Sequence, residues 1–329
     1  MKRVFRIMPL ITALFLTFAS CSQSFFINDG CTWGTTYHIV YRADADLHDS
    51  IRIVMAQIDS SLSMFNPHSL VSRVNAGTDS AADGHFRAVM DVATRVNTLS
   101  GGRFDPTVGP VVNLWGFGPD GERAIPDSAA IAVALRSVGL AECGLTPQGR
   151  IVKKSPETYF DFSAVAKGYG VDCVADMLAR NGVSDFMVEI GGEVVVQGTN
   201  PSGRPWRIQV DAPTASMTHD GLTVLEMGPQ RRALASSGNY RNFRTDSTGV
   251  RFGHTIDPRT GRPVQTDVLA ATIRTERCAE ADALATACMT MSADSALAML
   301  ERADVPGMVI TVVADSFVML STPQFFDEP

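Results

Sequence analysis

Apolar residues follow helical or strand periodicity along nearly the whole chain. From Thr36 to Tyr41 they alternate with polar residues, which predicts a strand. Residues 49–65 place an apolar stripe on one helical face before Pro67 prevents continuation. The same reasoning predicts a short helix or turn at 69–75 and helices at 86–100, 127–138, 279–287 and 292–302. A further helix is expected to follow the segment 161–168 and to run through Arg180. Strands are predicted at 151–154, 158–162, 186–190, 194–197, 205–210, 222–227, 232–235, 250–254, 269–274, 308–313 and 317–320.

This mixture of helices and strands has no regular βαβ alternation, so an α+β fold is favoured over a doubly wound sheet. With 329 residues the chain is long enough for one large domain or two interlocked ones. An apolar content of 45% and a charged content of 19% are typical of an ordinary globular protein.

The first twenty residues differ from the rest. A basic stretch in residues 1–6 precedes an apolar run at 7–18 that is too short for a stable membrane-spanning helix. Phe18-Ala19-Ser20-Cys21 resembles a bacterial lipobox, and the alternative is an ordinary secretory signal cleaved nearby. We therefore expect an exported lipoprotein on the periplasmic side, anchored to a membrane through Cys21. Residues 1–20 would be the signal peptide and residues 21–30 a tether.

Charge and cysteine usage exclude several classes of protein. Removing residues 1–20 takes away three positive charges and no acid, so the formal charge falls from −7 to −10. Such a balance argues against nucleic-acid binding, which requires a basic face. The five cysteines after Cys21 are scattered and lack metal-ligand spacing, so buried free thiols are favoured over a zinc site or a disulfide framework.

The alanine-rich stretch at residues 279–287 carries the first candidate chemistry. Its composition favours helix, and Asp282 and Thr286 stand four apart on one face of it. A carboxylate and a hydroxyl are hard oxygen donors of the kind that Mg²⁺ or Ca²⁺ takes. The alternative is a solvated helix face.

Polar residues among glycines give three further candidates. Residues 236–241 follow a strand and could form a turn that offers backbone N–H groups to an anion. Lys167 stands before Gly168 at a helix start, where it could contact phosphate, and a surface lysine is the alternative. His254 opens the polar segment 254–263, with a structural histidine as the alternative.

Nine short segments carry a family resemblance. They are Gly34-Thr35, Ser63-Met64-Phe65 with Ser69 and Asn75, residues 104–118, residues 161–168, Gly191-Gly192-Glu193, Pro205-Trp206, residues 236–241, residues 254–263, and Ala281-Asp282 with Thr286. In this order they resemble the ApbE family, the FAD:protein FMN transferases. The resemblance implies mixed or antiparallel sheets packed with helices, one interlocked domain over residues 31–329, and an active site in a cleft between its two halves.

The resemblance also implies a reaction. Members take FAD, cleave its pyrophosphate with Mg²⁺ and join FMN to a threonine or serine of an acceptor protein, and AMP leaves. A divalent ion is needed because the pyrophosphate is rich in negative charge. By similarity the metal ligands are Asp282, Thr286 and the backbone carbonyl of Ala164. Lys167 would lie near the flavin nucleotide, with Asp161 as a hydrogen-bonding partner.

Other residues are implicated in flavin binding by the same resemblance. Phe65 stands where the family has an aromatic residue that stacks on the flavin ring, and Trp33 stands where methionine is usual. The remaining matches to flavin-nucleotide contacts are Arg103, Phe104, Asp105 and Ile256. Fixing local turns is the alternative role for Asp105 and Asp257.

A general base must take the proton of the attacking hydroxyl. His254 is the candidate because its unperturbed pKa lies near neutral, and Asp257 could orient it or replace it. The implied acceptor is a membrane-associated redox subunit with a Ser/Thr flavinylation motif. The alternatives are an FAD pyrophosphatase that uses the same metal site and a non-catalytic FAD-binding lipoprotein.

Overall fold

The fold is built on one eight-stranded sheet. The computed structural model describes residues 23–119, 121, 124–213, 221–238, 243–245, 251–313 and 316–327. The strand order is β1-β2-β5-β6-β9-β14-β15-β16, and every neighbouring pair is antiparallel. These strands are β1 (Ser24–Thr32), β2 (Thr35–Ala43), β5 (Phe186–Ile190), β6 (Glu193–Gln197), β9 (Arg232–Gly238), β14 (Ala270–Thr275), β15 (Gly307–Val313) and β16 (Ser316–Ser321).

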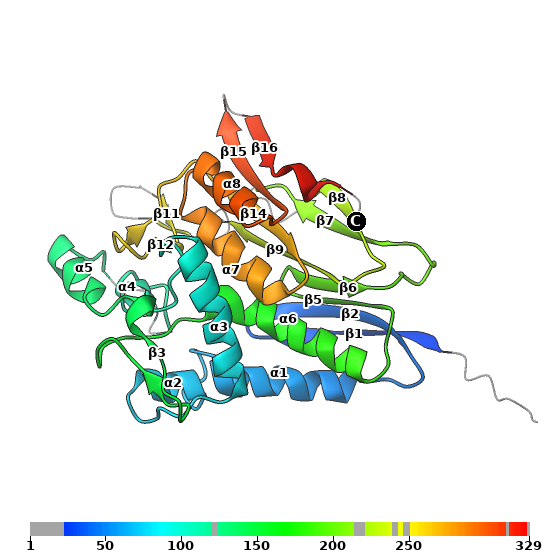
Figure 1. Ribbon diagram of the computed structural model, residues 1–329, viewed down its shortest axis with the longest axis horizontal. Coiled ribbons are helices and arrows are strands. Elements are labelled where there is room, and N and C mark those ends of the chain that lie inside the picture. Colours follow the sequence, from blue (N-terminus) through cyan, green and yellow to red (C-terminus); the bar gives the residue numbers. More distant parts are fainter. Residues whose placement is uncertain are drawn as a thin grey trace, which may run out of the picture.

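Helices cover one face of this sheet, as Figure 1 shows. They are α1 (His48–Leu62), α3 (Gly84–Leu99), α6 (Ser163–Arg180), α7 (Cys278–Met289) and α8 (Ala293–Arg302). Helices α6 and α7 pack against the strands, and α1 and α3 pack on them in turn. Every residue of α7 is buried except Glu280 and Thr286, because its small alanine side chains let α6, α3 and the sheet approach closely. The predicted α+β fold, with antiparallel sheets packed with helices, is confirmed.

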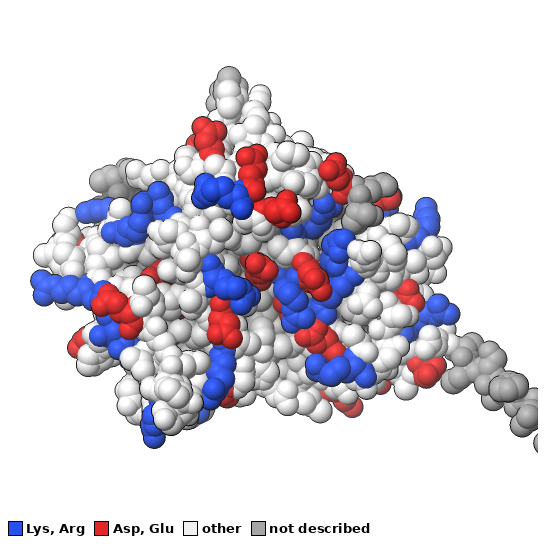
Figure 2. All heavy atoms as spheres, viewed as in Figure 1, with Lys and Arg blue, Asp and Glu red and all other residues white. Residues whose placement is uncertain are grey.

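The opposite face of the sheet is covered by a hairpin of β7 (Trp206–Asp211) and β8 (Gly221–Met227). Trp206 and Met227 pack with Val196 and Ile310 in a second core. None of the helices that the structure describes combines the length and apolar character needed to cross a bilayer. Basic and acidic side chains are interspersed over the face shown in Figure 2.

Smaller elements gather beside the ends of α3 and α6 (Figure 1). The 3₁₀ turn η2 (Pro323–Phe325) is not one of them, because it packs beside β15 near the chain end. The elements beside α3 and α6 are α2 (Leu70–Asn75), α4 (Gly109–Leu114), α5 (Ser128–Leu135), β3 (Gly144–Leu145), β4 (Ile151–Val152), β10 (Phe243–Thr245), β11 (Arg251–Gly253), β12 (Ile256–Asp257), β13 (Arg262–Pro263) and the 3₁₀ turn η1 (Leu140–Glu142). Val111, Trp115, Ile131 and Ile256 form a third, small core there. This core fixes the loops that border the functional site.

The tether predicted for residues 21–30 is wrong from Ser24 onward. Strand β1 pairs with β2 along its whole length, from Ser24 opposite Ala43 to Thr32 opposite Thr35. Phe26 stacks on Tyr41 with ring centroids 5.7 Å apart, and the Tyr41 hydroxyl donates to the buried Asn28 side chain at 2.9 Å. These cross-strand contacts order a stretch in which three apolar residues stand together at 25–27, without the alternation that predicts a strand. The prediction of buried thiols is confirmed for Cys278 and Cys288, but it is wrong for Cys31 on this strand, which is exposed.

The strand predicted at residues 158–162 is also wrong. Only Tyr159 makes a bridge, to Val108. The amide of the Asn75 side chain takes the place of a neighbouring strand, because its nitrogen donates to the Phe160 carbonyl at 2.9 Å and its oxygen accepts from the Phe160 N–H at 2.8 Å. The backbone is therefore satisfied without a sheet, and Phe160 and Phe162 remain free to fill the core.

Candidate functional site

A cavity of about 580 Å³ lies where the start of α6, the middle of α7 and the end of β9 meet two loops. We call it the site cavity. Eleven of the residues predicted from the sequence line it: Phe65, Arg103, Phe104, Asp105, Asp161, Ala164, Lys167, His254, Ile256, Asp282 and Thr286. The fold thus brings together segments that lie far apart in the sequence.

Asp282 and Thr286 do not lie on a solvated helix face. Asp282 is only 4% exposed, and its Oδ2 accepts a hydrogen bond from the Gly168 amide at 3.0 Å. The Thr286 hydroxyl lies 3.2 Å from Ser237 Oγ on β9. A Cβ at Gly168 would lie 2.4 Å from the Cys278 carbonyl oxygen, so glycine is required where α6 meets α7.

The same hydrogen bond affects Ala164. In a regular α-helix the Gly168 amide would bond the carbonyl four residues earlier, which is that of Ala164. Here Asp282 competes for this donor, and the Ala164 carbonyl keeps acceptor capacity beside the site cavity. A carboxylate, a hydroxyl and a carbonyl are therefore the oxygen donors of this end of the cavity.

An ion pair not predicted as part of the site lies next to these donors. Lys167 Nζ is 2.5 Å from Glu193 Oε2, and the Glu193 side chain is 3% exposed. Burial opposes the charge of Lys167, but Glu193 and Asp282 outweigh it and raise the pKa of Lys167. Burial, opposed by Lys167 and reinforced by Asp282, raises the pKa of the Glu193 carboxyl. The sequence signal was an acid that opens the apolar strand Glu193–Gln197 after two glycines.

The donor set fits a hard divalent cation. Burial raises the pKa of Asp282, and no lysine, arginine or histidine nitrogen of the described residues makes an ion pair with it within 4.0 Å. A buried carboxylate without such a partner favours a bound cation. Among the described residues no group of three His, Cys, Asp or Glu side chains could hold a metal, so a metal bound here would also need hydroxyl, backbone or substrate oxygens. Mg²⁺ commonly binds through one carboxylate and substrate phosphates.

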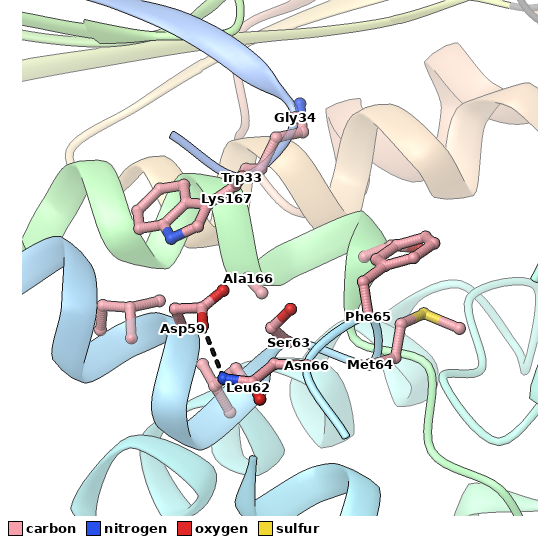
Figure 3. A pocket seen from close by; sticks show the side chains of 12 residues that line it. Trp33, Gly34, Asp59, Leu62, Ser63, Met64, Phe65, Asn66, Ala166 and Lys167 are labelled. Atoms are coloured by element: carbon pink, nitrogen blue, oxygen red, sulfur yellow. Dashed lines mark hydrogen bonds between the residues drawn. The ribbon is translucent and has the colours of Figure 1, made fainter. Parts of the chain in front are cut away.

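A second cavity, of about 770 Å³, adjoins the first and shares Met64, Phe65, Ser163 and Lys167 with it. We call it the aromatic cavity. Trp33 and Phe65 border it from different elements, and Asp59 and Ser63 lie between them (Figure 3). Asp59 is held by the Asn66 side chain, which donates to it at 2.7 Å (Figure 3).

Trp33 is held in an uncommon conformation at this cavity. It has φ of 50° and Gly34 has φ of 77°, which gives the β1–β2 hairpin positive φ at both turn residues. A bulky residue with positive φ is strained and persists where its surroundings hold it. The indole N–H donates to the Met55 carbonyl at 3.3 Å, and the ring lies where a Cβ on Gly170 would be 2.2 Å away. The turn and α6 thus fix the indole beside the aromatic cavity.

Two predicted acids serve the local structure. Asp105 accepts from the Thr107 amide at 2.8 Å and from the Leu140 amide at 3.0 Å. Both oxygens of Asp257 accept from Arg259, at 3.0 and 3.2 Å, and Arg103 lies at 4.0 Å. Burial opposes ionisation of Asp257, but its arginine partners more than offset it and lower its pKa.

The structure therefore does not bring Asp257 into the site cavity with His254. Asp257 borders a neighbouring cavity instead. A carboxylate with a lowered pKa that is bound to arginine is a weak general base. The expectation that Asp257 replaces His254 as the base is not supported by this geometry.

His254 and Asp161 face the site cavity together. The centroid of the His254 ring lies 6.4 Å from that of Phe117. Burial raises the pKa of Asp161, although its carboxylate accepts from the Ser163 amide at 2.9 Å. This hydrogen bond places Asp161 just before the start of α6, in the lining of the site cavity.

The predicted turn at residues 236–241 is partly wrong. Ser236, Ser237 and Gly238 continue β9 and pair with Thr272, Ala271 and Ala270 of β14, and residues 239–241 lie outside the described part of the chain. This backbone thus pairs with β14, and Ser236 and Ser237 line the cavity as strand residues.

Known proteins share this sequence and fold. A profile described as the ApbE family matches residues 33–309. The chain is 38% identical over 307 residues to a FAD:protein FMN transferase of Vibrio cholerae, covering 90% of each protein. It is 33% identical to one of Haemophilus influenzae, covering 96% of this chain and 95% of the relative.

Solved structures agree. The flavin transferase ApbE of Vibrio cholerae superposes with a TM-score of 0.82 at 34% identity, over 92% of this chain and 98% of that chain. The apo flavinyl transferase ApbE of Pseudomonas stutzeri gives a TM-score of 0.82 at 30% identity, over 93% and 98%. The chain therefore belongs to the ApbE family.

Proposed function

We propose that this protein transfers FMN from FAD to a serine or threonine hydroxyl of an acceptor protein, as an FAD:protein FMN transferase. One observation carries the proposal: a buried carboxylate–hydroxyl pair, a lysine and a histidine line one cavity that joins an aromatic one. This arrangement suits a substrate with a flat ring at one end and a pyrophosphate beyond it. The family and its relatives give the same activity.

Asp282, Thr286 and the Ala164 carbonyl would hold Mg²⁺. When bound, Mg²⁺ offsets negative charge on the pyrophosphate oxygens as the phosphorus–oxygen bond breaks. Ser237 positions the Thr286 hydroxyl, and Gly168 positions the carboxylate of Asp282. Lys167, held by Glu193, adds a positive charge beside the phosphates.

The flavin ring would lie in the aromatic cavity. Phe65 offers a largely exposed face, and Trp33 is rigidly held by its turn and by Met55. Arg103, Phe104 and Ile256 border the site cavity, where they would contact the rest of the nucleotide. Ring stacking on aromatic side chains contributes about 1–3 kcal/mol per base in comparable sites.

His254 would act as the general base. The acceptor hydroxyl oxygen forms a bond to the FMN-side phosphorus, the bond from that phosphorus to the bridging oxygen breaks, and AMP leaves with that oxygen. The hydroxyl proton passes to the imidazole of His254. Replacing His254 with alanine would then abolish labelling at saturating FAD and Mg²⁺, and near-normal transfer by this variant would contradict the assignment.

The exported, membrane-anchored location is part of the proposal. Its support is the basic and apolar pattern of residues 1–18 and the lipobox-like residues that end in Cys21. The acceptor would then be a redox subunit exposed on the outer side of the inner membrane, with a short Ser/Thr flavinylation motif. Radiolabelled palmitate incorporation that is lost in Cys21→Ser would support the anchor, and unchanged incorporation would contradict it.

One incubation tests the activity. The protein is mixed with FAD, Mg²⁺ and the candidate acceptor, and in-gel flavin fluorescence and AMP are measured. Labelled acceptor together with AMP supports the transferase. FMN and AMP without labelled acceptor would instead indicate a pyrophosphatase, and intact bound FAD would indicate a binding protein.

A further inference from the structure

A third cavity borders the site cavity, and apart from Arg103 its lining residues have no role in the mechanism above. It has a volume of about 620 Å³ and is formed around β11, β12 and β13. We call it the basic cavity and define it by Arg103, Arg259, Arg262, Asp257 and Phe252. Arg103 and Thr290 line both the basic cavity and the site cavity, so the two adjoin each other at these residues.

Positive charge is in excess in the basic cavity. Its described lining holds three arginines and one acid, Asp257, in a chain whose formal charge is −7. Asp257 is shared by Arg259 and Arg103. Arg262 is exposed and donates to the neutral Ser128 hydroxyl at 2.9 Å. A cleft lined by one sign of charge attracts ligands of the opposite sign.

An aromatic wall runs from the basic cavity to the proposed base. The ring centroid of Phe252 lies 5.3 Å from that of Trp115 and 6.2 Å from that of Phe117. The ring centroid of Phe117 lies 6.4 Å from that of His254. The indole N–H of Trp115 donates to the Gly261 carbonyl at 2.8 Å, which ties this wall to the turn that carries Arg262. The wall therefore holds the basic cavity in a set position relative to His254.

We propose that the basic cavity docks the acceptor protein by binding acidic residues that flank the modified serine or threonine. The inference rests on the proposed FMN transfer and names how the second substrate is recognised. The site and aromatic cavities are occupied by FAD in that reaction, so the acceptor must approach from a neighbouring surface. A segment seated in the basic cavity would place its hydroxyl at the shared border, on the His254 side. The arginines would select acidic neighbours of that hydroxyl.

The test measures docking separately from transfer. A fluorescein-labelled peptide with one threonine flanked by aspartate and glutamate is titrated with the full chain in the presence of FAD and Mg²⁺, and anisotropy is recorded. The comparison peptide carries asparagine and glutamine in place of the acids. We expect the acidic peptide to bind about tenfold more tightly at low salt, with the preference shrinking as salt rises.

Variants locate the effect. Arg262→Glu should remove the preference for the acidic peptide, and a peptide with lysine in the flanking positions should regain affinity for this variant. Arg204→Glu is the matched control, because Arg204 is also exposed and donates to a serine hydroxyl, at 3.2 Å from Ser202, but lies outside the basic cavity. This control should keep the preference.

Two outcomes would overturn the proposal. One is an unchanged preference in Arg262→Glu. The other is a weaker affinity of Arg262→Glu for FAD, measured by flavin fluorescence, because the basic cavity would then belong to the nucleotide. Failure of the wild-type protein to label any acceptor would contradict the proposed function instead, and anisotropy would still report docking.

Discussion

The carboxylate of Asp282 accepts a hydrogen bond from the amide of Gly168, 114 residues earlier in the chain, at 3.0 Å. This bond joins the two helices that meet at the site, α6 and α7, and brings the proposed metal ligand Ala164 to the same cavity as Asp282. The absence of a side chain at residue 168 makes the contact possible. The proposed metal site therefore depends on the packing of α6 against α7.

Replacing Asp282 with asparagine should abolish catalysis while it preserves the fold. Asparagine keeps an oxygen that can accept from Gly168 but removes the charge that attracts Mg²⁺, so AMP release should fall by more than about 100-fold. Mg²⁺ should raise the Tm of the wild type and leave that of the variant unchanged. The control is Asp294→Asn on the exposed side of α8. An Mg²⁺-dependent Tm shift in Asp282→Asn would contradict the assignment of this carboxylate as a ligand.

Metal binding should release protons. Burial raises the pKa values of Asp282 and Glu193, so the folded, metal-free protein binds more protons than the unfolded chain at pH values above the ordinary carboxyl range of about 4. The contribution of these two carboxyl groups to the free energy of unfolding of the metal-free protein therefore falls as pH rises through their raised pKa values. Mg²⁺ favours the ionised forms, so its apparent affinity should rise over the same interval.

Calorimetry in buffers of different ionisation enthalpy measures this proton release at a single pH. The wild type should release protons when Mg²⁺ binds, and Glu193→Gln should release fewer. Equal proton release by the two proteins would show that Glu193 does not titrate with metal binding.

Glu193→Gln should also lower stability. At a pH above the raised pKa of Glu193, where its side chain is ionised, the variant leaves the Lys167 ammonium without the carboxylate that lies 2.5 Å away. Removing one partner of a fully buried ion pair lowers the free energy of unfolding by about 3–5 kcal/mol. Because about a third of the Lys167 side chain is exposed, we expect a smaller loss of about 1–3 kcal/mol, measured by urea unfolding. The double variant Lys167→Met/Glu193→Gln should recover part of this loss. No recovery would mean that the cost comes from packing around Glu193 and not from the unpaired charge.

Phe65→Ala should weaken FAD binding with little effect on stability. Phe65 is 67% exposed, so its truncation should change the free energy of unfolding by less than about 0.5 kcal/mol. Loss of stacking should weaken FAD affinity by about 1–3 kcal/mol, measured by quenching of flavin fluorescence. Trp33→Ala should lower both affinity and stability, because the indole also binds Met55 and packs on Gly170. Unchanged affinity in Phe65→Ala would place the flavin ring elsewhere.

The sequence by itself determined much of the fold and most of the site. Apolar periodicity predicted α1, α3 and α8, and local composition predicted α7, because a single element's preferences are written in its own residues. The ordered motifs identified the family, and eleven of the residues they named line one cavity. Local patterns failed where contacts with another segment order the chain, as in β1, which forms a hairpin with β2, and at residues 158–162, where Asn75 binds the backbone of Phe160.

Only the tertiary structure decided how these residues act on one another. Whether Asp282 faces water or a cavity depends on how α7 packs against α6, and helical spacing allows both. The pairing of Lys167 with Glu193 and of Asp257 with Arg259 decides which acid stands beside the proposed metal site and which is neutralised outside it. Charge interactions and burial act through space, so residues far apart in sequence acquire their pKa values and partners only when the chain has folded.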